Sequence, residues 1–166
     1  MKKQTERVLT AIFCDDIRHE IGNKMSFMGC YQGELFIPAV PTSLSKLCIF
    51  ATALTPIERP FKNLTFRIVM DDKVELARLE IPNEAFSAIP DVVDETATRK
   101  SVSTALMFSP FVIKEPTSLR LVADTEEGEV IGPRLLIKIA DIAAQVVEAP
   151  TTGQSKPAKT ARKKKS

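Results

Sequence analysis

The chain has 166 residues, of which 44% are apolar, and a formal net charge of +2. This length and composition suit one domain built around a single hydrophobic core. No apolar run approaches the ~20 residues that a membrane-spanning helix requires. The basic start also lacks the small-residue cleavage site of a signal peptide. We therefore expect one soluble, cytoplasmic domain with no membrane partner.

The positive charge is concentrated at the carboxyl end. Residues 151–166 contribute six positive charges and no acid, so residues 1–150 carry a net charge of −4. The same segment has no large apolar side chain, and no burial can offset the entropy of ordering it. We therefore expect a β-sandwich domain over residues 1–148 and a flexible lysine-rich tail over residues 149–166.

Two neighbouring segments show the alternation of a half-buried strand. Residues 65–70 and 74–81 alternate apolar and polar side chains, and residues 71–73 between them are turn formers. This pattern predicts an antiparallel hairpin. The alternation changes phase within the second segment, which predicts a β-bulge near Ala77 and Arg78.

A second hairpin is predicted from residues 119–123 and 129–139, which flank a glycine-bearing turn. Gly132 and Pro133 interrupt the second of these segments. Because proline cannot donate a hydrogen bond to a strand ladder, either an edge position or a second bulge is expected there.

The remaining segments indicate more strands and few helices. Residues 8–14 and 47–54 are apolar at successive positions, which predicts central strands covered on both faces. Helix signals are limited to residues 83–86 and 141–147. Further strands are expected at residues 25–28, 34–37 and 103–108. The pattern predicts an all-β fold, a two-sheet antiparallel sandwich of immunoglobulin-like type with about eight or nine strands.

The three cysteines, Cys14, Cys30 and Cys48, form an odd set without a C-x-x-C pair. Each lies in or beside an apolar segment, so we favour buried thiols in a reducing cytosol. A disulfide framework is the second interpretation, and a free reactive thiol is the third.

A polar motif follows the first predicted strand. It consists of Cys14, Asp15, Asp16, Ile17, Arg18, His19 and Glu20, and then Gly22, Lys24, Met28, Gly29 and Tyr31. This stretch resembles the opening of an uncharacterised family of small bacterial and bacteriophage β-sandwich proteins. The resemblance continues more weakly to about residue 139 and includes Pro38 and residues 46–48 and 55–56. It implies a sandwich fold and a prokaryotic or phage-infected cytoplasm or a phage particle, and it implies no catalytic residues.

Within the motif lie four candidate metal ligands: Asp15, Asp16, His19 and Glu20. On a helical turn Asp15 and His19 would share a face, and this is the basis of a metal-dependent hydrolase hypothesis. The alternative is a polar connection whose carboxylates pair with Arg18 or Lys24 at the surface. We favour this alternative, because catalytic metal sites normally draw ligands from several segments and the chain has a single histidine.

Signals for other chemistry are absent from the sequence, which contains no G-x-S-x-G elbow, P-loop or dinucleotide fingerprint. The protein is therefore expected to have no cofactor and to be a non-enzyme. Tyr31, the single tyrosine, could present its hydroxyl at a binding surface. We favour a buried ring with a hydrogen-bonded hydroxyl.

The leading hypothesis is a non-enzymatic binding or structural module that contacts an unknown protein partner or assembly. Its tail is suited to nucleic acid or another polyanion through counterion release, although a merely solubilising terminus stays open. The alternatives are the metal-dependent hydrolase and a nucleic-acid-associated protein that acts through the tail. The basic residues of the tail are Lys156, Lys159, Arg162, Lys163, Lys164 and Lys165.

Overall fold

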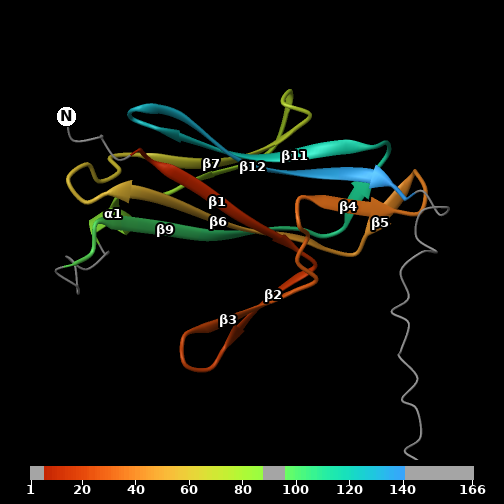
Figure 1. Ribbon diagram of the computed structural model, residues 1–166, viewed down its shortest axis with the longest axis horizontal. Helices are drawn as coiled ribbons and strands as arrows, with labels where there is room; N and C mark the ends of the chain where they lie inside the picture. The colour runs from red at the N-terminus through yellow and green to blue at the C-terminus, as the bar shows by residue number, and fades with distance from the viewer. Residues whose placement is uncertain (1–5, 88–95, 141–166) are drawn as a thin grey trace, which may run out of the picture.

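The computed structural model describes residues 6–87 and 96–140, which form twelve strands and one short helix (Figure 1). The helix, α1 (Asn83–Ser87), is far too short to cross a membrane. The strands are β1 (Val8–Cys14), β2 (Asp16–Glu20), β3 (Lys24–Met28), β4 (Glu34–Ile37), β5 (Thr42–Leu44), β6 (Leu47–Pro56), β7 (Leu64–Met70), β8 (Val74–Glu80), β9 (Arg99–Phe108), β10 (Phe111–Ile113), β11 (Thr117–Thr125) and β12 (Gly128–Ile139).

Most of these strands belong to two sheets that lie as two layers in Figure 1. One sheet has the order β1-β6-β9, and the other has the order β4-β12-β11-β7-β8. Strands β5 and β10 form a small pair, and β2 and β3 form a hairpin that projects from the body. The all-β prediction is confirmed. The strand count exceeds the expected eight or nine, and the sheets are not purely antiparallel because β4 pairs with β12 in parallel.

The core lies between the inward faces of these two sheets. Phe13 and Ile49 point inward from the three-stranded sheet, and Ile68, Leu121 and Leu135 point inward from the five-stranded sheet. All five are buried. Alternate positions along each strand reach this core, and each fully buried side chain contributes about 1.5–3 kcal/mol of transfer free energy.

The hairpin of β7 and β8 is confirmed. Its turn contains Asp71 and Asp72, which adopt the left-handed conformation at φ 51° and 55°. The pairing changes register so that Ile68 faces Ala77 while the next residue faces Glu75. The skipped residue, Leu76, lies next to the predicted bulge position, so the bulge is also confirmed.

The hairpin of β11 and β12 contains the second bulge. Arg120 faces Arg134 and Val122 faces Ile131, so Gly132 and Pro133 together lie opposite the single residue Leu121, and β12 has one extra residue there. Gly132 and Pro133 were expected to mark either an edge position or a bulge, and the structure shows a bulge.

Two predictions from apolar runs need correction. β1 is not a central strand but lies at one end of its sheet, with Val8 and Ile12 exposed. β6 is central, yet its outward residues Phe50 and Leu54 are only half-buried, so the described residues cover its outer face only in part. The helix at residues 83–86 is confirmed, whereas residues 141–147 and the whole tail lie outside the described residues.

Candidate protein-binding surface

The base of the projecting hairpin is held by a contact between its two chain segments. Asp15, which lies between β1 and β2, accepts a hydrogen bond from the hydroxyl of Tyr31, whose ring packs against the core. Burial, and then the hydrogen bond to Asp15, raise the pKa of Tyr31. Gly29 has φ +64°, and a Cβ atom there would lie 2.0 Å from Oδ2 of Asp15. A glycine is therefore required where these segments meet.

Asp16 fixes the first residue of β2 to the body. Its Oδ1 accepts a hydrogen bond from Nζ of Lys46 at 2.7 Å, and its Oδ2 accepts one from Nε of Arg18 at 3.2 Å. The hydrogen bonds from Lys46 and then Arg18 lower the pKa of the Asp16 carboxyl group. Asp15, Asp16, Arg18 and Tyr31 of the polar motif therefore form a structural joint, which we call the hairpin joint, between β1, the hairpin and the residue that precedes β6.

The four candidate metal ligands do not converge. β2 is a strand and not a helical turn, so Asp15 and His19 do not share a helical face. The carboxylate of Glu20 accepts a hydrogen bond from the hydroxyl of Ser26, and His19 is exposed. Across residues 6–87 and 96–140, no group of three or more His, Cys, Asp or Glu side chains is placed to hold a metal ion. The hydrolase hypothesis therefore lacks its site.

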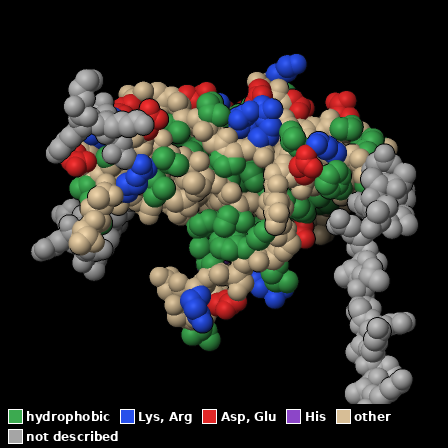
Figure 2. Space-filling model, viewed as in Figure 1, with side chains coloured by type: hydrophobic (Ala, Val, Ile, Leu, Met, Phe, Trp, Pro, Cys, Tyr) green, Lys and Arg blue, Asp and Glu red, His purple; other side chains and the backbone are tan. Residues whose placement is uncertain are grey.

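Apolar side chains gather instead on the outward side of the three-stranded sheet, between the sheet and the projecting hairpin (Figure 2). Ile12, Phe50 and Ala105 lie opposite one another across β1, β6 and β9. The ring of Phe27 in the hairpin packs on Phe50 with the ring centroids 5.2 Å apart. We call this surface the outer apolar face, and its residues are Ile12, Met25, Phe27, Phe50, Ala105 and Met107. Met107 is the most open of its large side chains, at 60% exposed.

The outward side of the other sheet has the opposite character. Arg67 donates two hydrogen bonds of 2.7 Å to Asp124 and is also paired with Glu129. Arg120 donates to Asp72 at 2.8 Å. The charges of these side chains are paired within the sheet, and exposed ion pairs of this kind contribute little to the free energy of folding. The outward side of the five-stranded sheet thus carries ion pairs between its exposed apolar residues, such as Ile131, whereas the residues of the outer apolar face are contiguous and uncharged. A contiguous exposed apolar patch is a feature of interaction surfaces.

The edge of the three-stranded sheet is open beside the outer apolar face. β9 is ten residues long and, in the described parts of the chain, pairs only with β6. After Arg99 and Lys100 it contains no charged residue. Of the two edge strands of the five-stranded sheet, β4 has only four residues, and β8 carries Glu75, Arg78 and a bulge, which are devices that prevent further pairing. β9 is also longer than the other edge strands of the two sheets, β1, β4 and β8, and therefore offers the longest template for an added strand.

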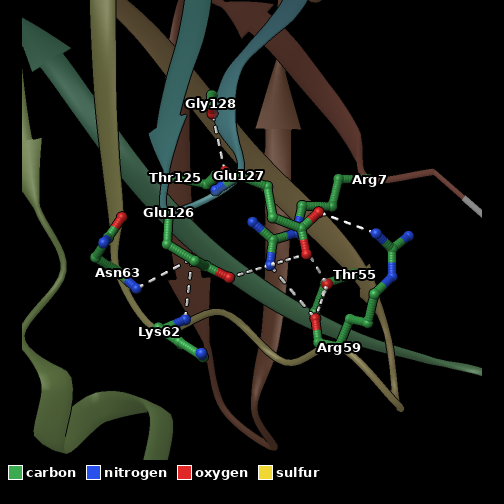
Figure 3. A network of polar contacts seen from close by, with 9 residues as sticks. All are labelled: Arg7, Thr55, Arg59, Lys62, Asn63, Thr125, Glu126, Glu127 and Gly128. Atoms are coloured by element: carbon green, nitrogen blue, oxygen red, sulfur yellow. Dashed lines mark hydrogen bonds and ion pairs between the residues drawn. The ribbon is translucent and has the colours of Figure 1, made fainter.

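A buried ionic network ties the start of β1 to the β11–β12 turn (Figure 3). The Arg7 side chain is only 4% exposed, pairs with Glu126, and stacks 4.7 Å from the ring centroid of Phe61. Glu126 also accepts hydrogen bonds from the backbone N–H groups of Lys62 and Asn63. Burial alone would raise the pKa of Glu126, but the hydrogen bonds from Arg7 and from the backbone outweigh it and lower the pKa to about 2. Because the charges are neutralised internally, this network is a structural element.

No protein-family model, curated protein or solved structure matches the chain. The assignment of a binding surface therefore rests on the geometry of the chain itself. Sequence reasoning singled out Asp15, Asp16, Arg18 and Tyr31, which form the hairpin joint, but it missed the outer apolar face. The signal that could have revealed this face was the apolar character of residues 8–14 and 47–54 on both sides, in a fold with too few helices to cover it. The basic tail residues lie outside the described part of the chain.

Proposed function

We propose that the protein is a non-enzymatic binding module, a sandwich of immunoglobulin-like type, that docks an extended segment of a partner protein along β9. The observation that carries this proposal is an uncovered apolar face beside an unguarded edge strand. In strand addition, main-chain hydrogen bonds provide affinity and alternate side chains provide specificity. The unpaired backbone groups of β9 can supply the hydrogen bonds, and the outer apolar face can contact the alternate side chains.

The chemistry of the surface specifies the segment. Ala105 and Met107 are two residues apart on the outward side of β9, so an added strand would place its alternate side chains beside them. Those side chains should be apolar, because Phe50 and the hairpin continue the apolar surface on the other side. Met25 and Met107 are unbranched and can repack around different apolar shapes. The expected ligand is therefore an extended segment with apolar residues at every second position.

We expect Met107→Lys to weaken such binding by about tenfold or more, because a lysine on the edge opposes both pairing and apolar burial. The probe is a displayed library of ten-residue peptides with alternate apolar positions, selected on the wild-type protein. Affinity of a selected peptide would be measured by fluorescence anisotropy. The matched control is Val112→Lys on β10, which changes an apolar side chain of 56% exposure outside this surface.

Three results would count against an extended peptide as the occupant of this surface. Selection of no peptide, or equal binding by the Met107→Lys protein, would contradict the proposal. A dimer detected by light scattering that Met107→Lys dissociates would show that a second copy occupies the surface, which also contradicts the proposed occupant. Circular dichroism of both variants would establish that each is folded.

We also propose that the tail contacts a polyanion, because residues 151–166 contribute six positive charges next to a body of net charge −4. Affinity for a short duplex DNA should fall steeply with salt, and log K should change by about −0.9 per released counterion against log salt concentration. Deletion of residues 151–166 should abolish this binding. A full-length variant with the six basic tail residues replaced by glutamine separates charge from length. Retained affinity in the deleted protein would refute the role of the tail.

A further inference from the structure

All three cysteines of the chain lie in one row, although they are far apart in sequence. Cys14 on β1 and Cys48 on β6 are directly opposite cross-strand partners. Cys30 lies on the other side of Cys14, between Tyr31, which is bridged to Phe13, and Met28, which is paired with Asp16. The row therefore runs from Cys30 through Cys14 to Cys48 and crosses the base of the hairpin.

The three thiols lie near one another but differ in their exposure to solvent. Cys14 and Cys48 are buried, and their Sγ atoms donate hydrogen bonds to the backbone carbonyls of Asp16 and Asp15. Burial, and then the nearby thiols of Cys48 and Cys30, raise the pKa of Cys14 to about 11. Cys30 is exposed, which corrects the sequence-based interpretation of three buried thiols. An oxidant from solution therefore reaches Cys30 first.

Disulfides join residues whose Cα atoms are ~4.4–6.8 Å apart, and the pairs Phe13–Tyr31 and Asp16–Met28 hold the segments of Cys14 and Cys30 side by side. We propose that Cys30 and Cys14 are the entry thiol and the resolving thiol of a reversible disulfide formed by a peroxide. Cys14 is the resolving residue because it occupies the position next to Cys30, whereas Cys48 lies one strand farther away.

The chemistry proceeds in two balanced steps. The Cys30 thiolate attacks a peroxide oxygen, an S–O bond forms as the O–O bond breaks, and the released hydroxide takes a proton to give water. The Cys14 sulfur then attacks the sulfur of the resulting sulfenic acid. The S–S bond forms, the S–O bond breaks, and the Cys14 proton leaves with the hydroxide as a second water. Two thiols lose two electrons in total, and the peroxide is reduced to two waters.

The disulfide would tie the end of β1 to the segment that leaves β3. Both segments form the base of the hairpin, and Phe27 of that hairpin contributes to the outer apolar face. Oxidation would then fix the position of the hairpin over this surface. This consequence for binding rests on the proposed function, whereas formation of the disulfide does not.

The test is thiol mapping by mass spectrometry on the full chain treated with hydrogen peroxide under non-denaturing conditions. Trypsin cuts after Arg18 and Lys46, so the three cysteines fall on separate peptides. We expect two of the three thiols to resist alkylation, a linked pair of peptides containing Cys14 and Cys30, and full recovery with dithiothreitol. Cys48→Ala should retain the linked pair. Cys30→Ser, a change at an exposed position, should leave Cys14 reduced under the same treatment.

A linked pair that includes Cys48, an intermolecular Cys30–Cys30 bond, or three unchanged thiols would each overturn the proposal. Ala105→Lys provides the separating control, because Ala105 lies on the proposed docking surface opposite Phe50 and outside the cysteine row. Disulfide formation in that variant should equal that of the wild type. Failure of peptide binding and failure of disulfide formation are therefore distinguishable.

Discussion

Gly29→Ala is expected to lower the free energy of unfolding by about 2–4 kcal/mol. An alanine at φ +64° is strained by about 1–2 kcal/mol. Its Cβ would also lie 2.0 Å from Oδ2 of Asp15, so the carboxylate must move away from the Tyr31 hydroxyl. The loss comprises backbone strain, steric conflict and a broken hydrogen bond. Urea denaturation followed by circular dichroism would measure it.

Gly33→Ala is the matched control for the steric contribution. Gly33 has φ +86°, but an added Cβ there would meet nothing within 4 Å. Gly33→Ala should therefore lower the free energy of unfolding only through backbone strain, by about 1 kcal/mol. In an Asp15→Ala background, Gly29→Ala should cost less than in the wild type, because the conflicting carboxylate is gone. Equal losses at both glycines would mean that the contact with Asp15 contributes nothing.

Glu126→Gln is expected to lower stability at pH 7 by about 1–3 kcal/mol, a range reduced for the partial exposure of the carboxylate. The charged carboxylate pairs with the buried Arg7 side chain and accepts two backbone hydrogen bonds. Glutamine retains the shape of the side chain but removes the charge. Arg7 is then left with Glu127 as its carboxylate partner, and burying an underpaired guanidinium is costly.

The same variant should change the response to acid. The pKa of Glu126 is about 2 in the folded protein and about 4.3 in the unfolded chain. Its contribution is therefore fully present above about pH 5 and is lost as the pH falls toward 2. Urea titrations at several pH values should give a flatter acid dependence for Glu126→Gln than for Glu115→Gln, a change at an exposed carboxylate. An unchanged slope would refute the role of Glu126.

The long strands could be predicted because their alternation reflects a core on one side only. Both hairpins and the bulge in β8 followed from side-chain phase, whereas Pro133 left a choice between an edge position and a second bulge, which the structure resolves as a bulge. The short strands β2, β5 and β10 escaped notice because three to five residues carry too little periodicity. The parallel pairing of β4 with β12 was also unpredictable, since register between distant segments depends on tertiary packing.

The candidate site was predictable only in part. The motif residues Asp15, Asp16 and Tyr31 were identified, but local spacing on a presumed helix suggested ligands, whereas the strand directs them to different partners. Apolar residues on both sides of a segment indicated complete burial. Among the described residues only the β2–β3 hairpin covers that sheet, and it covers only part of it, so the rest of this apolar surface faces outward. Apolar residues that face solvent can be recognised in a sequence only when it is known how many layers of the fold are available to bury them.

The position of β12 within its sheet affects how the protein is made. β12 is inserted between β4 and β11, and the ion pair of Lys138 with Glu34 joins residues 104 positions apart. On the ribosome, β4 emerges long before its partner, and the sheet stays divided until residue 139 has been synthesised. Until then two strands expose unpaired backbone groups that neighbouring nascent chains could capture. The five-stranded sheet therefore cannot close before β12 is made, and β4 stays without its partner for about a hundred residues of synthesis.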